Sequence, residues 1–307
     1  MGRALLFLRG GFAAFQSAHT ATGRACALLR AGFRVRKSEV HSMFPYIRLW
    51  GLAIPTYGVL FVAGIALACL LAWWRARRAG LALDDLVVIA AVAIGLGLVG
   101  AKLLFFITSV PFSVLVDSLV RGDWSIIAKS GLVFYGGLLG GALGAFWGAR
   151  LVKARLGDYC DVLVPCIPLA HAFGRVGCFS SGCCYGMPYD GPGAVVYSQA
   201  VGGAPAGIPL FPVQLVEAGL NLLVCAGLLW FLRRLRPRWA SLGLYLMVYA
   251  VERFGLEFLR YDAIRGVFWG VSSSQWISIG LFAVGAGLML WTYGRERRRR
   301  IVSEMKT

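Results

Sequence analysis

The chain has 307 residues, of which 59% are hydrophobic and only 15% are charged, and its mean hydropathy is +0.72. Soluble domains carry roughly a quarter of charged residues, so this composition excludes an ordinary soluble domain and predicts an integral membrane protein. The net charge of +17 would suit a nucleic-acid partner. Lysine and arginine nevertheless fall in short blocks after apolar runs, as topology signals do, and no nucleic acid is expected as a partner.

Seven apolar segments are long enough to span a bilayer, so the predicted fold is an all-α, polytopic integral membrane protein with about seven transmembrane helices. The fourth segment is short and contains Pro165 and Pro168, which predicts a kink or a partly re-entrant helix. The expected spans are Thr56–Trp74, Leu86–Ile107, Leu132–Leu151, Cys160–Val176, Val213–Leu232, Leu242–Phe258 and Trp276–Trp291.

Four basic blocks follow the first, third, fifth and seventh spans and predict the orientation of the chain. With seven spans all four lie on one face, which is then the cytoplasmic one. The loop from Cys178 to Phe211 is placed outside, and it contains no lysine or arginine. The blocks are Arg75, Arg77 and Arg78; Arg150, Lys153 and Arg155; Arg233, Arg234, Arg236 and Arg238; and Arg295 with Arg297–Arg300.

The first 42 residues do not fit this topology, because they carry seven basic residues and only one acid, Glu39. Such a basic segment resists translocation, yet the topology places it outside. Met43 opens a natural beginning for the membrane domain, and our hypothesis is that translation starts there. We therefore expect a basic extension over 1–42, a membrane domain over 43–294 and a basic cytoplasmic tail over 295–307.

Charged residues at membrane depth are costly, so they need a structural partner or a function. His171 and Arg175 are four residues apart in the fourth span, and a helix presents both on one side. In the sixth span Tyr249, Arg253 and Glu257 share a helix face in the same way. An internal salt bridge that fixes helix packing would explain why Arg253 and Glu257 lie within the membrane. Two arginines at matched outer depth instead favour a site for an anionic phospholipid headgroup.

The segment around Arg175 reads GRVGCFSSGCCYG and resembles the signature G-R-x-G-N-F-x-N-G-x-x-x-G of the prolipoprotein diacylglyceryl transferases. The glycines of this segment would let backbone approach a ligand. Other motifs of the family recur in the same order between about Met43 and Tyr293. The matching positions are Tyr57 and Gly58; Phe134, Gly136, Gly137, Leu138 and Gly140; Gly174, Arg175, Gly177, Phe179, Gly182 and Gly186; Pro212, Gln214, Leu215 and Glu217; Tyr249, Arg253, Glu257 and Arg260; and Ser272 and Gln275.

The resemblance implies a reaction in which the diacylglyceryl group of phosphatidylglycerol passes to the lipobox cysteine thiol of a prolipoprotein, and glycerol 1-phosphate leaves. The implied partners are phosphatidylglycerol, prolipoprotein signal peptides and the lipid bilayer, with neither a cofactor nor a metal. The implied location is the bacterial inner membrane, with the site near its extracytoplasmic face. Arg175 and Arg253 would supply positive charge to the departing phosphate, and Glu257 would orient Arg253. The implied substrate-binding residues are Tyr57, Arg175, Gly182, Gly186, Tyr249, Arg253 and Glu257.

The chain departs from the family pattern at the expected base, because Tyr135 replaces the histidine of the F-H-G-G-L motif. A phenol is a poor base at neutral pH, whereas the attacking thiol needs one. His171 is a candidate substitute, and a hydrogen-bonded structural histidine is the alternative. Cys178 and Ser181 replace the two asparagines of the main motif. Gln214, Glu217 and Gln275 are expected to hold helices and loops together.

Cys178, Cys183 and Cys184 form a cluster with three open interpretations. A disulfide in the oxidising outer compartment is one, and free thiols at the edge of the site are another. A metal site is the third, although the spacing matches no standard zinc pattern. At the level of function, a transporter for an anionic lipid and a family member that only binds lipid are the alternatives to the transferase.

Overall fold

The computed structural model describes residues 45–49, 52–124, 131, 133–198, 201–234, 237–261, 267–268 and 271–305. The basic extension over 1–42 and Met43 therefore lie outside the described residues. The chain divides into two compact units. The first unit comprises Met1–Val59, Val176–Val216 and Phe258–Arg265, and the second comprises Leu60–Arg175, Glu217–Glu257 and Gly266–Thr307.

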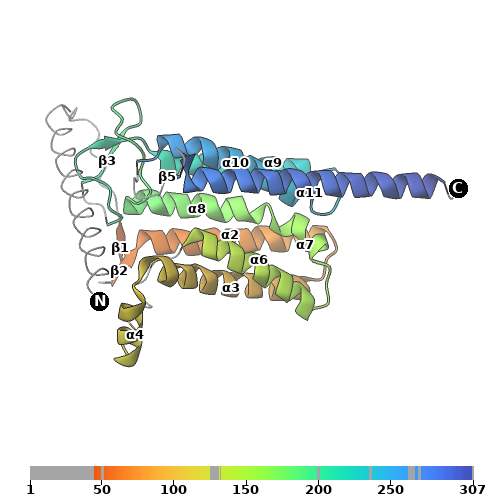
Figure 1. Cartoon of the computed structure of the whole chain (residues 1–307), viewed down its shortest axis with the longest axis horizontal. Coiled ribbons are helices and arrows are strands. Elements are labelled where there is room, and N and C mark those ends of the chain that lie inside the picture. The colour runs from red at the N-terminus through yellow and green to blue at the C-terminus, as the bar shows by residue number, and fades with distance from the viewer. Residues whose placement is uncertain are drawn as a thin grey trace, which may run out of the picture. The chain divides into compact units, whose positions relative to one another are not determined.

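A helix is present at each of the seven predicted places, which confirms the polytopic helical architecture (Figure 1). A short helix that was not predicted, α4 (Phe112–Val120), follows the second span. The seven places are occupied by α2 (Thr56–Arg78), α3 (Leu83–Ser109), α6 (Phe134–Leu151), the pair α7 (Leu156–Leu163) and α8 (Cys166–Ser181), α9 (Val213–Phe231), α10 (Ala240–Leu256) and α11 (Ser273–Glu304).

By length and composition, α2, α3, α9 and α11 qualify as membrane spans, and α7 with α8 makes a fifth if the bent pair counts as one. The predicted kink is confirmed, because α7 and α8 meet at 41° around Pro165. Helix α6 is rich in glycine, and α10 has only 17 residues and carries Glu252 and Arg253, so neither passes the same test. A one-turn 3-10 helix, η1 (Glu257–Leu259), extends α10.

Glycines let α3 and α6 pack with their backbones in contact. A Cβ atom on Gly136 would overlap the carbonyl oxygen of Gly100, and one on Gly140 would overlap that of Leu96. Gly136 and Gly140 of the FYGGLLG motif thus have a packing role that any side chain would disrupt.

At the end of the second unit that holds the predicted cytoplasmic blocks, partly buried polar contacts tie several helices together. The hydroxyl of Tyr159 donates to the carbonyl of Ala82 at 3.2 Å, and Arg75 donates to the carbonyl of Asp161 at 2.9 Å. Ser241 at the start of α10 donates to the Asp161 carboxylate at 2.6 Å. Helices α10 and α11 lie side by side in the same unit.

The described residues of the first unit form two short hairpins, although the sequence predicted only helices. Strand β1 (Tyr46–Leu49) pairs antiparallel with β2 (Leu52–Pro55), which leads directly into α2. Strand β3 (Val195–Val196) pairs antiparallel with β4 (Pro209–Leu210). In the second unit β5 (Val267–Phe268) pairs with β6 (Val271–Ser272) just before α11. Ser272 and Gln275 form a reciprocal capping box there, which agrees with the structural role expected of Gln275.

Candidate functional site

Arg175 lies in a buried ion-pair cluster formed by α8 and α9. Its Nε is 3.0 Å from Oε1 of Glu217, whose side chain is 1% exposed. The same Nε donates to Nε2 of His171 at 3.1 Å, and this nitrogen is 3.8 Å from the Glu217 carboxylate. The predicted pairing of His171 with Arg175 on one helix face is confirmed. In this arrangement Nε2 of His171 acts as a hydrogen-bond acceptor.

Arg253 lies in a second buried cluster, formed by α10, η1 and α11. One of its terminal nitrogens, Nη2, is 2.6 Å from the Glu257 carboxylate and donates to the hydroxyl of Ser274 at 3.0 Å. The residue is only 4% exposed. Its other terminal nitrogen, Nη1, is buried and has no hydrogen-bond partner within the described part of the chain. An unsatisfied buried guanidinium N–H is costly, so this nitrogen is available to an acceptor that enters the site.

Tyr249 links the two arginine clusters. It interacts electrostatically with both Arg175 and Arg253, and also with Glu217 and Tyr135. Its ring lies 5.8 Å from that of His171 and is stacked on that of Tyr245. Arg175 and Arg253, which the sequence predicted to lie at matched membrane depth on separate helices, therefore have Tyr249 as a common neighbour.

Asn221 and Glu252 are also part of this cluster, although neither was predicted as a site residue. The amide of Asn221 donates to the Glu252 carboxylate at 2.9 Å and to the carbonyl of Glu217 at 2.9 Å. Glu252 interacts electrostatically with Glu217, Arg175 and Arg253. Its Oε2 is buried and accepts no hydrogen bond from the residues that the structure describes. The signal in the sequence was the spacing of four residues between Glu217 and Asn221, which places both on one face of α9.

Glu217 and Gln214 have different surroundings, although one structural role was expected for both. Glu217 holds α9 against α8 through Arg175, and so it is also the carboxylate of the arginine cluster. Gln214, in the first unit, donates to the carbonyl of Cys183 at 2.9 Å and lies 3.4 Å from the Tyr197 hydroxyl. Gln214 thus anchors the loop that follows α8.

Tyr57 and three of the signature glycines, Gly177, Gly182 and Gly186, belong to the first unit. Gly182 has a φ of +71°, which favours glycine. A Cβ on Gly186 would overlap the carbonyl oxygen of Phe211, and one on Gly177 would lie 3.0 Å from the Tyr57 ring. These contacts provide a packing reason for the glycines, while their predicted role in approaching a ligand stays a prediction.

The three clustered cysteines are free thiols in the structure, and their sulfur atoms all lie within 4.8 Å of one another. The disulfide therefore stays a prediction, and mass spectrometry under nonreducing conditions would detect it as a loss of two hydrogens. Nearby, the Tyr197 hydroxyl donates to the carbonyl of Phe179 at 3.2 Å. Burial raises the pKa of Tyr197 to about 12, so this donor keeps its proton at neutral pH.

Comparison with known proteins decides the family. The family model described as prolipoprotein diacylglyceryl transferase matches residues 45–291. The chain belongs to the prolipoprotein diacylglyceryl transferase family. The resemblance drawn from the motifs is thereby confirmed.

Curated relatives of this family match over most of their length. A Clostridium perfringens protein named phosphatidylglycerol–prolipoprotein diacylglyceryl transferase 2 is 32% identical over 83% of this chain and 97% of its own length. A Clostridium tetani protein named phosphatidylglycerol–prolipoprotein diacylglyceryl transferase is 33% identical over 82% of this chain and 97% of its own length. An Azotobacter vinelandii protein of the same name is 32% identical over 83% of this chain and 99% of its own length.

Proposed function

We propose that this chain transfers the diacylglyceryl group of phosphatidylglycerol to the lipobox cysteine thiol of prolipoproteins and releases glycerol 1-phosphate. Membership of the transferase family and the names of its relatives support this reaction. We place the chain in the bacterial inner membrane as a multi-pass protein, with its site near the extracytoplasmic face. This placement rests on the basic blocks of the sequence.

The observation that carries the proposal is the buried Arg253, whose Nη2 is held by Glu257 and Ser274 while Nη1 has no partner among the described residues. Anionic oxygens of carboxylate and phosphate groups are strong acceptors for such a guanidinium nitrogen, and the phosphate of phosphatidylglycerol would supply one. Tyr249 interacts electrostatically with both Arg253 and Arg175, and we assign one phosphate headgroup to both positive charges.

In the proposed reaction the thiolate sulfur attacks the phosphate-bearing carbon of the diacylglyceryl unit. A carbon–sulfur bond forms, the carbon–oxygen bond breaks, and the electron pair leaves with glycerol 1-phosphate. The developing negative charge lies on the phosphate, where buried positive charge stabilises the transition state most effectively. Arg175 and Arg253 are assigned to this role. Tyr57, Gly182 and Gly186 are assigned to lipid contacts because they match family motifs.

The thiol proton needs an acceptor, and we assign it to Glu252 rather than to His171 or Tyr135. Nε2 of His171 already accepts a hydrogen bond from Arg175. His171 is therefore assigned to positioning Arg175. Tyr135 is a phenol and a weak base. Glu252 offers a buried carboxylate oxygen without a partner among the described residues.

A family member that binds lipid without transferring it is the second candidate, because Tyr135 stands where the motif histidine is expected. Complementation of a strain depleted of its own transferase separates the two. Rescue of growth, with transfer of labelled diacylglyceryl to a prolipoprotein in isolated membranes, is the expected result. Failure of a well-expressed protein would favour the binding-only role or an anionic-lipid transporter.

Two variants connect the result to the site. Arg253→Ala should abolish rescue, whereas Arg121→Ala, in an exposed ion pair with Asp117 on α4, should preserve it. Full activity of both Arg253→Ala and Arg175→Ala would contradict the assignment of the phosphate to these arginines.

A further inference from the structure

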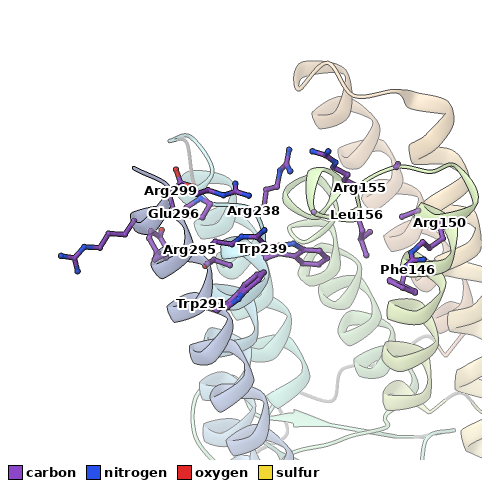
Figure 2. Close-up of a pocket in the computed structure, with 17 residues that line it drawn as sticks. Phe146, Arg150, Arg155, Leu156, Arg238, Trp239, Trp291, Arg295, Glu296 and Arg299 are labelled. Carbon is purple, nitrogen blue, oxygen red and sulfur yellow. The ribbon is translucent and has the colours of Figure 1, made fainter. Parts of the chain in front are cut away.

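A cavity of about 1460 Å³ opens in the second unit, at the helix ends that carry the predicted cytoplasmic blocks (Figure 2). Its wall comes from the end of α6, the start of α7, the segment before α10 and the last turns of α11. The proposed catalytic cluster lies elsewhere, because Trp239 and Arg253 are 14 residues apart at opposite ends of α10. At 1.5 Å per residue this separation is about 21 Å, which places the two sites at different membrane depths.

The lining of this cavity is strongly basic, and every cation in it is an arginine. Six arginines line it against a single acid, Glu296, and one of the six, Arg238, is 2.5 Å from the Asp158 carboxylate. Figure 2 shows Arg150 and Arg155 on one side of the opening and Arg295 and Arg299 on the other. Guanidinium groups bind phosphate in a bidentate manner, which a lysine cannot do. The arginines are Arg150, Arg155, Arg238, Arg295, Arg297 and Arg299.

Aromatic side chains line the cavity together with the arginines. The guanidinium of Arg150 lies 4.9 Å from the centre of the Phe146 ring, and that of Arg295 lies 5.4 Å from the Trp291 ring. Trp239 has a φ of +73°, unusual for a bulky residue, and also lines the cavity. Tryptophan and arginine together are typical of the headgroup region of a bilayer. The expected ligand is therefore one that has both a charged group and an apolar part.

The positive-inside rule explains why the predicted cytoplasmic ends of the helices are basic. It does not require these ends to enclose a cavity. It also counts lysine and arginine alike, whereas the lining contains arginine alone. Self-repulsion of clustered guanidinium groups destabilises the protein unless an anion lies among them. Basic pockets between membrane helices on the cytoplasmic side are suited to anionic lipid headgroups.

We propose that this cavity binds the phosphate headgroup of an anionic phospholipid from the cytoplasmic leaflet, separately from the substrate bound at the arginine clusters. The arginines hold the phosphate, and Phe146 and Trp291 contact the lipid where headgroup meets acyl chain. The choice of leaflet rests on the orientation proposed above, but binding itself depends neither on that orientation nor on transferase activity.

The test uses the full chain purified in a neutral detergent, with lipid binding measured by native mass spectrometry. The probes are phosphatidylglycerol, cardiolipin, zwitterionic phosphatidylcholine and inorganic pyrophosphate. The double variant Arg155→Gln/Arg297→Gln removes two charges from the lining. The matched control Arg78→Gln/Arg298→Gln removes two charges from the same end of the helices without touching the cavity.

The anionic lipids should bind the cavity variant roughly 30-fold more weakly than the parent at one site, the factor expected when two arginines leave a charged interface. The control should bind as the parent does, and phosphatidylcholine should bind neither protein at that site. If anionic lipids bind both double variants equally weakly, the loss of binding follows from the net charge alone, and the proposal is overturned. Pyrophosphate binding without lipid binding would assign the cavity to a soluble anion instead. If the parent protein binds anionic lipid in the cavity but shows no transferase activity, the proposed function is contradicted and the proposed lipid cavity is supported.

Discussion

Glu217 is the residue on which the Arg175 cluster depends, because its carboxylate lies 3.0 Å from Arg175 and is 1% exposed. Removing one partner of a buried pair leaves the other charge uncompensated. Glu217→Gln should therefore lower the stability by about 3 kcal/mol and reduce transfer strongly. The measurements are the denaturation midpoint in detergent and the transfer rate in membranes. Arg121→Gln, in the exposed pair with Asp117, is the control and should cost less than about 1 kcal/mol.

Glu252 is the residue to which we assign the thiol proton, and a single substitution tests that assignment. Glu252→Gln keeps the size of the side chain and an oxygen for the Asn221 amide, so the fold should persist. If Glu252 accepts the thiol proton, transfer should fall by roughly 100-fold or more and the acidic limb of the pH–rate profile should disappear. His171→Ala should reduce the rate less and retain that limb. The reverse pattern would make His171 the base.

Side-chain contacts within one helix could be predicted from the sequence, whereas side-chain contacts between helices could not. The pairs His171–Arg175 and Arg253–Glu257 follow from the spacing of four residues. The pairing of Arg175 with Glu217 joins two helices across 42 positions of sequence, and no periodicity encodes it. The position of Glu252 in this cluster was missed for the same reason, since its partner Asn221 lies on α9.

At the scale of elements, α3 and α6 depend on glycine for their close approach. A Cβ on Gly140 would overlap the backbone of Leu96, whereas one on Gly95 of α3 would meet no atom within 4 Å. Gly140→Ala should separate the helices and lower the denaturation midpoint, while Gly95→Ala should leave it unchanged or raise it slightly, because alanine favours helix. Equal midpoints for the two variants would show that this packing contributes nothing to stability.

The positions of the spans followed from hydropathy, but the lengths of the elements did not. Helix α11 continues to Glu304, beyond the predicted end of its span at Trp291, because arginine and glutamate favour helix although they are polar. Part of the segment expected as a tail over 295–307 is thus helical. The hairpins were missed because strands of two to four residues leave no detectable alternation. The break at Pro165 was predictable, because proline removes a backbone donor.

At the scale of the whole molecule, the proposed reaction and the proposed lipid cavity both depend on which way the chain crosses the membrane. The basic lining near Arg155, Arg238 and Arg297 should face the cytoplasm, and the loop near Asp190 should face outward. Alkaline phosphatase, which is active only after export, should therefore be active when inserted after Asp190 and inactive when fused after Arg155. A fluorescent protein fused after Arg297 should be bright.

The proposed reaction requires the arginine clusters on the outside, because its proposed acceptor is the cysteine thiol of an exported protein. A reversed pattern of fusion activities would move the basic cavity to the outer leaflet and the arginine clusters to the inner one. The proposed transfer to an exported thiol would then be contradicted. Binding of an anionic lipid in the cavity would still be expected, because guanidinium groups attract phosphate in either leaflet.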